Sequence, residues 1–220
     1  SIQDLGNHRV KITYSSKASE VQNGMCFQSR PTVRDHAGTF FWKSKDITMT
    51  SLDIHFLHGF GMVGQHSENI TMDDVDFEAP KESGRTTAGY ADFVQMSGCK
   101  GTINISNCTF AGPHDDPINI HGTFNTVTAI SSDRRTITVQ YNHNETAGFP
   151  NFFEGDEIEF MTKGNMITVE DSVRTVTKVD GPDGMGGNMG DGSGSLTTIK
   201  LTLNEAVPSD VQVNQHVVEN

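Results

Sequence analysis

An eight-residue pattern that recurs three times in the first half of the chain limits the folds available to it. Each copy reads apolar, polar, apolar, two polar, apolar, polar, apolar, which describes two short alternating strands joined by a bend. The copies begin at Ile47, Ile70 and Ile103, so the second interval is longer than the first. A repeat of just over twenty residues has the length of one coil of a parallel β-helix. We interpret residues 79–89, in the longer interval, as an inserted loop.

A second class of strand precedes each copy of the pattern. Its members are residues 39–42, 61–63 and 92–96, and residues 115–121 read as the next one. Aligning the apolar positions of the last two members places Val94 beside Ile118 and Met96 beside Ile120. The last strand alternates apolar and polar residues, which predicts a buried face with Ile118 and Ile120 and an open face with Asn119 and His121.

The same register brings three carboxylates together. It places Asp92 level with Asp116 on the neighbouring coil, and adjacent coils lie about 4.8 Å apart. Asp115 precedes Asp116 by one residue, so we expect it to point a different way. Coupled carboxylates separate their pKa values, so one can hold a proton while the others are ionised. This arrangement suits glycoside hydrolysis, in which one acid protonates the leaving oxygen and a carboxylate activates water.

Four further residues near this cluster are candidates for substrate binding. His114 and His121 flank the acids and could bind sugar hydroxyls, although either could instead donate an N–H to a backbone carbonyl. Asn119 shares the open face, where inward-facing asparagine ladders are a structural alternative. Arg85 lies in the inserted loop and could contact a sugar hydroxyl or an aspartate, or be a solvated surface arginine. Trp42 is a possible stacking platform, but packing in the core is favoured.

The second half of the chain lacks the repeat and carries closely spaced strands separated by turn signals. The expected strands are residues 125–130, 135–141, 156–161, 166–169, 173–179 and 196–203. Antiparallel strands of this number suit a small barrel or sandwich. We therefore expect parallel β-helix coils with the active site over residues 1–122, an inserted barrel-like domain over 123–212, and a truncated return toward the β-helix over 213–220. The glycine-rich stretch 182–195 is interpreted as an exposed loop.

Composition excludes some classes of function. The formal net charge of −12 argues against binding nucleic acid through its phosphates. No apolar run approaches the roughly 20 residues of a membrane span, and the first residues lack the features of a signal peptide. Three cysteines, at positions 26, 99 and 108, show no metal-ligand spacing. Cys108 is expected to be a small buried residue, and a disulfide between Cys99 and Cys108 stays open.

Several motifs together resemble the exo-acting alpha-1,3-galactosidases of glycoside hydrolase family 110, which remove galactose from blood-group-B-type glycans. The matching stretches are residues 83–87, 91–92, 97–101, 107–110 and 115–123. The resemblance implies a right-handed parallel β-helix with an inserted β-barrel, an inverting mechanism, and no metal or other cofactor. It implies Asp115 as general acid, with Asp92 and Asp116 positioning and deprotonating water. It also implies a secreted or periplasmic enzyme, of which this chain is a fragment.

Two other functions compete with this interpretation. The spacing of one Asp followed a coil later by two also resembles the β-helical polygalacturonases. An acidic polysaccharide requires cationic groups, however, and few lie near the predicted site beyond Arg85 and Lys100. The second alternative is a non-catalytic glycan-binding β-helix, which has no use for three converging carboxylates. The favoured partner is a glycan ending in an alpha-linked galactose, and the sequence leaves the oligomeric state open.

Overall fold

The computed structural model describes residues 1–28, 34, 36–143, 146–147, 149–182 and 198–219. They belong to two compact units, Ser1–Thr32 and Val33–Asn220. The first unit holds an antiparallel hairpin of β1 (Ile2–Gly6) and β2 (Arg9–Ile12). Its turn residues Asn7 and His8 both have positive φ, 52° and 58°, which suits a tight two-residue turn. The expectation that parallel coils begin at residue 1 is therefore wrong for this hairpin, because a local turn reverses the chain.

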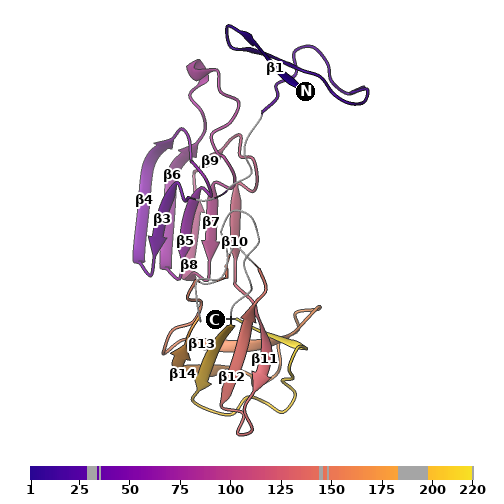
Figure 1. Ribbon diagram of the computed structural model, residues 1–220. Helices are drawn as coiled ribbons and strands as arrows, with labels where there is room; N and C mark the ends of the chain where they lie inside the picture. The colour runs from indigo at the N-terminus through magenta and orange to yellow at the C-terminus, as the bar shows by residue number, and fades with distance from the viewer. Residues whose placement is uncertain (29–33, 35, 144–145, 148, 183–197, 220) are drawn as a thin grey trace. The chain divides into compact units, whose positions relative to one another are not determined.

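The three copies of the repeated pattern lie side by side in one parallel sheet (Figure 1). Its strands are β4 (Lys45–Ile54), β6 (Glu68–Phe77) and β8 (Lys100–Ser106), and the short β9 (Thr109–Phe110) also pairs with β6. Ile47 aligns with Ile70, and Ile70 aligns with Ile103. This is the register that the repeated pattern predicts. The longer interval includes an exposed three-residue 3₁₀ turn, η1 (Lys81–Ser83).

The second class of strand forms another parallel sheet. Its order is β10 (Ile118–His121), β7 (Val94–Ser97), β5 (Met62–Gln65) and β3 (Thr39–Trp42). Val94 aligns with Ile118 and Met96 with Ile120, which confirms the predicted alignment of these two strands. We call this sheet the site sheet, because its strands carry most of the candidate residues described below.

The expectation that Ile118 and Ile120 are buried is wrong. Their side chains are 39% and 50% exposed. They lie on β10, which pairs with β7 on one side, and no other described strand pairs with β10 on its other side. An inward-facing position in a stacked sheet is buried only when strands lie on both sides of it, so alternation alone overestimates burial at the last strand.

The apolar side chains of the two parallel sheets form one core, which includes Ile70, Met72, Val94 and Met96. Parallel strands are stable when their faces are covered in this way. The aromatic ring of Phe77 belongs to this core and is fully buried. The arrangement is all-β with two parallel sheets, and its assignment to a right-handed parallel β-helix stays a prediction.

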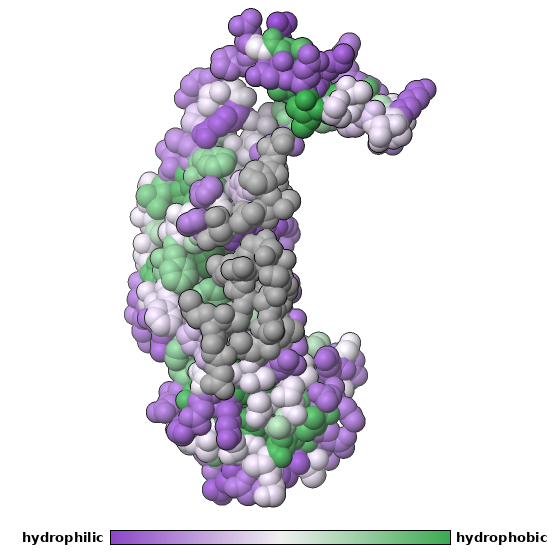
Figure 2. Space-filling view, viewed as in Figure 1, coloured by the Kyte–Doolittle hydropathy of each residue, from purple (hydrophilic) through white to green (hydrophobic). Residues whose placement is uncertain are grey.

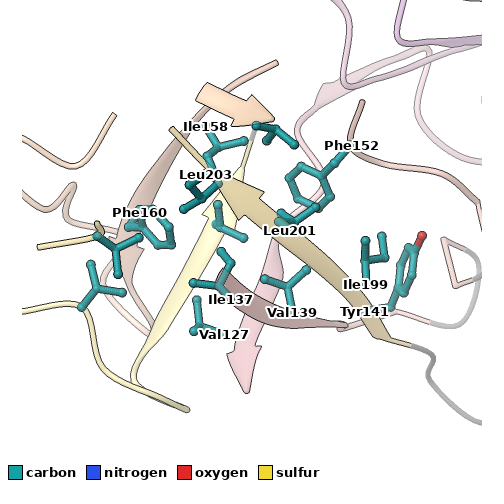
Figure 3. Packing of buried hydrophobic residues seen from close by; sticks show 14 of the residues in the cluster. Val127, Ile137, Val139, Tyr141, Phe152, Ile158, Phe160, Ile199, Leu201 and Leu203 are labelled. Carbon is teal, nitrogen blue, oxygen red and sulfur yellow. The ribbon is translucent and has the colours of Figure 1, made fainter. Parts of the chain in front are cut away.

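The second half of the chain forms a closed six-stranded barrel. In order around the barrel the strands are β11 (Asn125–Ile130), β12 (Thr136–Tyr141), β15 (Thr198–Leu203), β14 (Arg174–Asp180), β13 (Glu157–Thr162) and β16 (His216–Glu219). All of its pairings are antiparallel. Inward-facing side chains such as Phe160, Leu201 and Val127 point toward one another and fill the interior (Figure 3). A small barrel is filled by its own side chains in this way.

Two details of the barrel differ from the sequence prediction. Residues 216–219 pair with β11 and β13, so the expected return of residues 213–220 toward the parallel sheets is wrong for this strand. Without β16 the barrel would have two open edges, and closing it satisfies their backbone hydrogen bonds. Residues 166–169 form a single bridge, between Met161 and Thr168, instead of a strand. Of the predicted loop at 182–195, all but Pro182 lies outside the described residues.

On the face shown in Figure 2, hydrophobic side chains over the strands of the β4 sheet are interspersed with hydrophilic ones. Exposed apolar residues at this sheet include Leu52, which is 42% exposed. Among the described residues, no helix has the length and apolar character needed to cross a membrane.

Candidate active site

A cavity of about 880 Å³ opens on the site sheet. The side chains of Phe40, Val63, Gln95 and Asn119 form one row along its wall, because the register of β3, β5, β7 and β10 aligns these four residues. A second row contains Gln65, Ser97 and His121, and Ser97 Oγ lies 2.9 Å from Thr123 Oγ1 beyond it. A cavity of this volume is in the usual range for small-molecule sites.

All three predicted carboxylates line this cavity. Asp92 immediately precedes Phe93, whose backbone N–H donates to the carbonyl of Asp116 at 3.1 Å, so the two coils are in hydrogen-bonding contact there. Asp92 is only 2% exposed, whereas Asp115 and Asp116 are exposed. The cluster therefore combines one buried acid with two that solvent reaches.

Arg34, which is not among the residues predicted from the sequence, lies among these acids. Its guanidinium forms a close ion pair with Asp115 through Nη2, and its Nη1 lies 3.7 Å from Asp92 Oδ1. It also lies over the ring of Phe60, 5.3 Å from the centroid. Arg34 lies outside every repeat and motif of the chain, so no sequence pattern connects it with the acids so much later in the sequence.

The electrostatic environment of Asp92 is unusual for an aspartate. Burial raises the pKa of its carboxyl, the charge of Asp115 raises it further, and a hydrogen bond from Asn119 opposes the shift. Asn119 Nδ2 donates to Oδ2 at 3.4 Å, but no described residue donates a hydrogen bond to Oδ1. The contact with Arg34 at 3.7 Å is an ion pair that is too long for a hydrogen bond. Perturbed, incompletely satisfied carboxylates of this kind are typical of functional sites.

Replacing Asp92 by asparagine should stabilise the folded protein most at neutral pH. The raised pKa means that the folded state holds the proton to higher pH than the unfolded chain does. The stability that this group contributes is therefore present below the ordinary aspartate pKa and is lost as pH rises through the raised pKa. We expect thermal unfolding to show a larger gain in Tm for Asp92→Asn near pH 7 than near pH 4.

The exposed Asp53 on β4 offers the matched control. Asp53→Asn should leave Tm unchanged within about 1 °C at both pH values, because an exposed carboxylate contributes little to stability. Equal changes in Tm for Asp92→Asn at both pH values would contradict the assignment of a destabilising buried charge at position 92.

Gln95 and His121 form a hydrogen-bonded pair on the cavity wall. Gln95 Nε2 lies 2.6 Å from His121 Nε2, and His121 Nδ1 lies 2.7 Å from the carbonyl oxygen of Gly122. The sequence predicted a site position for His121, and the structure places it on the cavity, which Asn119 also lines. Gln95 was missed, because its position on an alternating strand does not distinguish it from any other polar residue.

Arg85 and His114 do not line the cavity. Arg85 Nη2 donates to the carbonyl of His55 at 3.1 Å, and its guanidinium lies over the ring of Phe56. The Nδ1 of His114 lies 2.6 Å from the carbonyl oxygen of Gly89. Both side chains therefore fit the structural alternatives: a surface arginine and a histidine that donates to a backbone carbonyl.

Two phenylalanines, Phe40 and Phe60, provide part of the aromatic wall of the cavity. Phe40 is 54% exposed and accessible to a ligand. Trp42 instead packs against Phe153 of the barrel half, with ring centroids 6.4 Å apart. Trp42 is 46% exposed, so the core packing that the sequence favoured is wrong for this side chain, and Trp42 does not line the cavity either.

The sequence of this chain is similar to those of several known alpha-1,3-galactosidases. The chain is 46% identical over 220 residues to alpha-1,3-galactosidase A of Streptomyces avermitilis, a match that covers 100% of this chain and 34% of the relative. It is 43% identical over 215 residues to alpha-1,3-galactosidase A of Peterkaempfera griseoplana, covering 96% of this chain and 29% of the relative. With alpha-1,3-galactosidase A of Akkermansia muciniphila it shares 30% identity, covering 100% of this chain and 34% of the relative.

The predicted resemblance to alpha-1,3-galactosidases is confirmed. This chain spans about a third of the length of the alpha-1,3-galactosidases it matches. A family model described as GLAA-B beta-barrel domain II matches residues 136–182, which include β12, β13 and β14. The three carboxylates lie outside this barrel match but inside the 220 residues shared with the alpha-1,3-galactosidase A of Streptomyces avermitilis.

The barrel half also contributes to the cavity of this alpha-1,3-galactosidase relative. The contributing residues are Phe124, Asn142, His143, Thr146 and Phe149. Asn142 Nδ2 donates to the carbonyl of Phe124 at 3.0 Å, and Thr126 Oγ1 donates to Asn142 Oδ1, so the asparagine side chain is fixed from two directions. The sequence could not predict this wall, because nothing in it relates the loop after β12 to the strands of the site sheet.

The open disulfide alternative does not hold. Cys99 and Cys108 are both thiols, and both pack against the core of the parallel sheets. The Sγ of Cys108 donates to the carbonyl oxygen of Ser106 at 3.1 Å. Within the described residues, no group of three or more His, Cys, Asp or Glu side chains is arranged to hold a metal ion.

Proposed function

We propose that the protein containing this chain is an exo-acting glycoside hydrolase that removes terminal alpha-1,3-linked galactose from glycans with inversion at the anomeric carbon. The observation that carries the proposal is the buried Asp92, whose pKa is raised, beside Asp115 and Asp116 on one cavity. Two carboxyl groups with different environments are the minimum equipment for acid/base hydrolysis of a glycosidic bond. The resemblance to the alpha-1,3-galactosidases supports the choice of sugar and linkage.

In the proposed reaction Asp115 is the general acid. Its carboxyl proton passes to the glycosidic oxygen as the bond from that oxygen to the anomeric carbon breaks. A water molecule attacks the anomeric carbon from the opposite face, and Asp92, assisted by Asp116, takes the proton that the water loses. A raised pKa makes the ionised Asp92 a stronger base, which favours it for this step. The enzyme ends with the proton on the base, and solvent exchange returns it to the acid.

The ion pair between Arg34 and Asp115 belongs to the free protein. Asp115 must face the glycosidic oxygen to act as an acid, and Arg34 is in contact with its Oδ2 in the free protein. We therefore propose that the bound sugar displaces Arg34 from Asp115 and leaves it beside Asp92, where its charge helps to orient the base. Arg34 is 26% exposed at its side chain, so it has room to move.

We also infer that the strands of the two parallel sheets are coils of a right-handed parallel β-helix. The two parallel sheets share one core, and successive strands alternate between them along the chain, as coils of a right-handed parallel β-helix would. In such a fold residues from neighbouring coils stack into rows. The rows formed by Phe40, Gln95 and Asn119, and by Gln65 and His121, are supported by the register of the site sheet.

The chemistry of the cavity favours a neutral sugar over a uronate. Among the described residues that line it, Arg34 is the one with a permanent positive charge, and two aspartates already engage it. A polygalacturonase would need cationic groups that are available to the substrate carboxylates. A binding module without activity would have no use for three carboxylates on one cavity.

The anomeric form of the released galactose tests the proposed function. The full-length protein should release galactose from an alpha-1,3-linked galactosyl disaccharide, and proton NMR during the first minutes should show the beta anomer before mutarotation mixes the two. Initial alpha-galactose would contradict single displacement while leaving hydrolysis intact. A protein that binds the disaccharide but releases no galactose would be a glycan-binding module, which contradicts the proposal. A homogalacturonan oligomer is the control substrate and should not be cleaved.

A further inference from the structure

Gln95 carries a buried amide oxygen that the fold leaves without a hydrogen-bond partner. Its side chain lines the cavity between Val63 and Asn119, and the residue is only 9% exposed. Among the described residues, none donates a hydrogen bond to Oε1. A buried unsatisfied amide oxygen is costly and rare in native structures, so its presence on a cavity wall requires an explanation.

The hydrogen bonds of His121 determine which end of the amide is left free. The carbonyl oxygen of Gly122 can only accept, so the proton of a neutral His121 ring is on Nδ1, which lies 2.7 Å from it. The other ring nitrogen, Nε2, is then an acceptor. It faces the amide nitrogen of Gln95 at 2.6 Å, which donates to it. While the ring is neutral, turning the oxygen of Gln95 toward His121 would lose this hydrogen bond and place two acceptors against each other.

We propose that Oε1 of Gln95 accepts a hydrogen bond from one hydroxyl of the galactose that is cleaved, with His121 holding the amide in the accepting orientation. This inference rests on the proposed function and identifies a residue that selects the substrate. A sugar hydroxyl is the donor that a cavity with buried acceptor oxygens is suited to bind, and Asp92 Oδ1 is a second unsatisfied acceptor on the same cavity. The oxygen is shielded from bulk solvent in the free protein.

A site of this kind should reject a sugar that lacks the hydroxyl, because the buried oxygen is then left unsatisfied in the complex. The experiment measures kcat/KM of the full-length protein for an alpha-galactoside and for its 2-, 3-, 4- and 6-deoxy analogues. For the wild-type protein, kcat/KM should be roughly 10- to 100-fold lower for the analogue that lacks the donating hydroxyl than for the parent sugar. This is the range expected for one unmade hydrogen bond to a buried group. The variant Gln95→Met keeps the length of the side chain and removes the acceptor. Its ratio of kcat/KM between the parent sugar and this same deoxy analogue should fall below about threefold.

A control variant makes the result specific. Gln140→Met removes a glutamine from β12 of the barrel that does not line the cavity, and should leave all four ratios at their wild-type values.

Three outcomes would overturn the inference. If Gln95→Met had the same parent-to-deoxy ratios of kcat/KM as wild type at every hydroxyl, a group other than Gln95 would be the one that recognises the sugar hydroxyls. If wild type turned over all four deoxy analogues within about threefold of the parent, no hydroxyl would depend on a buried acceptor, and no variant is needed to reach that conclusion. If wild type hydrolysed no alpha-galactoside at all, the proposed function would fail and this inference with it, which separates the two kinds of failure.

Discussion

Replacing Asp115 by asparagine in the full-length protein should lower kcat for a natural alpha-1,3-galactoside by about 10³-fold, within the range that general acid catalysis contributes. Asparagine keeps the shape of the side chain but has no proton to deliver to the leaving oxygen. The side chain of Asp115 is 40% exposed, and its one described ion pair is with Arg34. We therefore expect Tm to change by no more than about 2 °C, since exposed ion pairs contribute little to stability.

The leaving group makes this experiment specific for the acid. A dinitrophenolate leaves readily without being protonated, so the loss in Asp115→Asn should be much smaller for a dinitrophenyl alpha-galactoside than for the natural disaccharide. Asp92→Asn removes the proposed base, which the hydrolysis of every substrate needs. The fall in kcat for this variant should therefore be similar for the natural disaccharide and for the dinitrophenyl galactoside. Asp53→Asn, on the exposed β4 strand, is the control that should retain wild-type rates.

The opposite pattern would assign the roles differently. If the activated substrate restored Asp92→Asn and left Asp115→Asn inactive, the buried carboxyl would be the acid and Asp115 the base. The raised pKa of Asp92 makes this outcome chemically reasonable, because a buried carboxyl also holds its proton to higher pH. Near-normal rates for Asp115→Asn with both substrates would remove Asp115 from the mechanism.

Replacing Phe77 by alanine should be the most destabilising change in the parallel sheets. The ring is fully buried, stacks on Phe110 with centroids 5.0 Å apart, and packs on Phe93 at 5.3 Å. Truncating a buried phenylalanine costs about 3–5 kcal/mol, because the lost burial is added to the cavity that is left behind. For a chain of 220 residues this cost corresponds to a fall in Tm of roughly 6–20 °C.

Phe56→Ala provides the matched comparison, since Phe56 is 43% exposed and contacts the guanidinium of Arg85. It should lower Tm by no more than about 3 °C. Phe77→Leu should lie between the two, because leucine refills much of the space. A Tm for Phe77→Ala within about 2 °C of wild type would mean that these three rings do not form the stable centre of the sheets. Because Phe93 directly follows Asp92, Phe77→Ala should also lower activity at temperatures well below its Tm.

The backbone of the site could be predicted because it depends on a periodic pattern. Apolar residues at regular intervals can be buried together only in one register, and a slip of one residue would turn every side chain to the other face. For this reason the alignments read from the sequence are the alignments found in both parallel sheets. The same register determined that Asp92 lies beside the pair at positions 115 and 116. Burial at Ile118 and Ile120 was mispredicted because alternation carries no information about where a stack of strands ends.

The remaining features of the site were decided only by the tertiary structure. Arg34 reaches the acids from a segment without periodicity, the loop after β12 closes one wall of the cavity, and β16 completes the barrel. The free oxygen of Gln95 follows from a chain of contacts that begins at the carbonyl of Gly122. Repeating patterns specify which residues stack, because burying the same apolar positions stabilises each repeat in the same way. Contacts between unlike segments form once each, so nothing in the sequence repeats to reveal them.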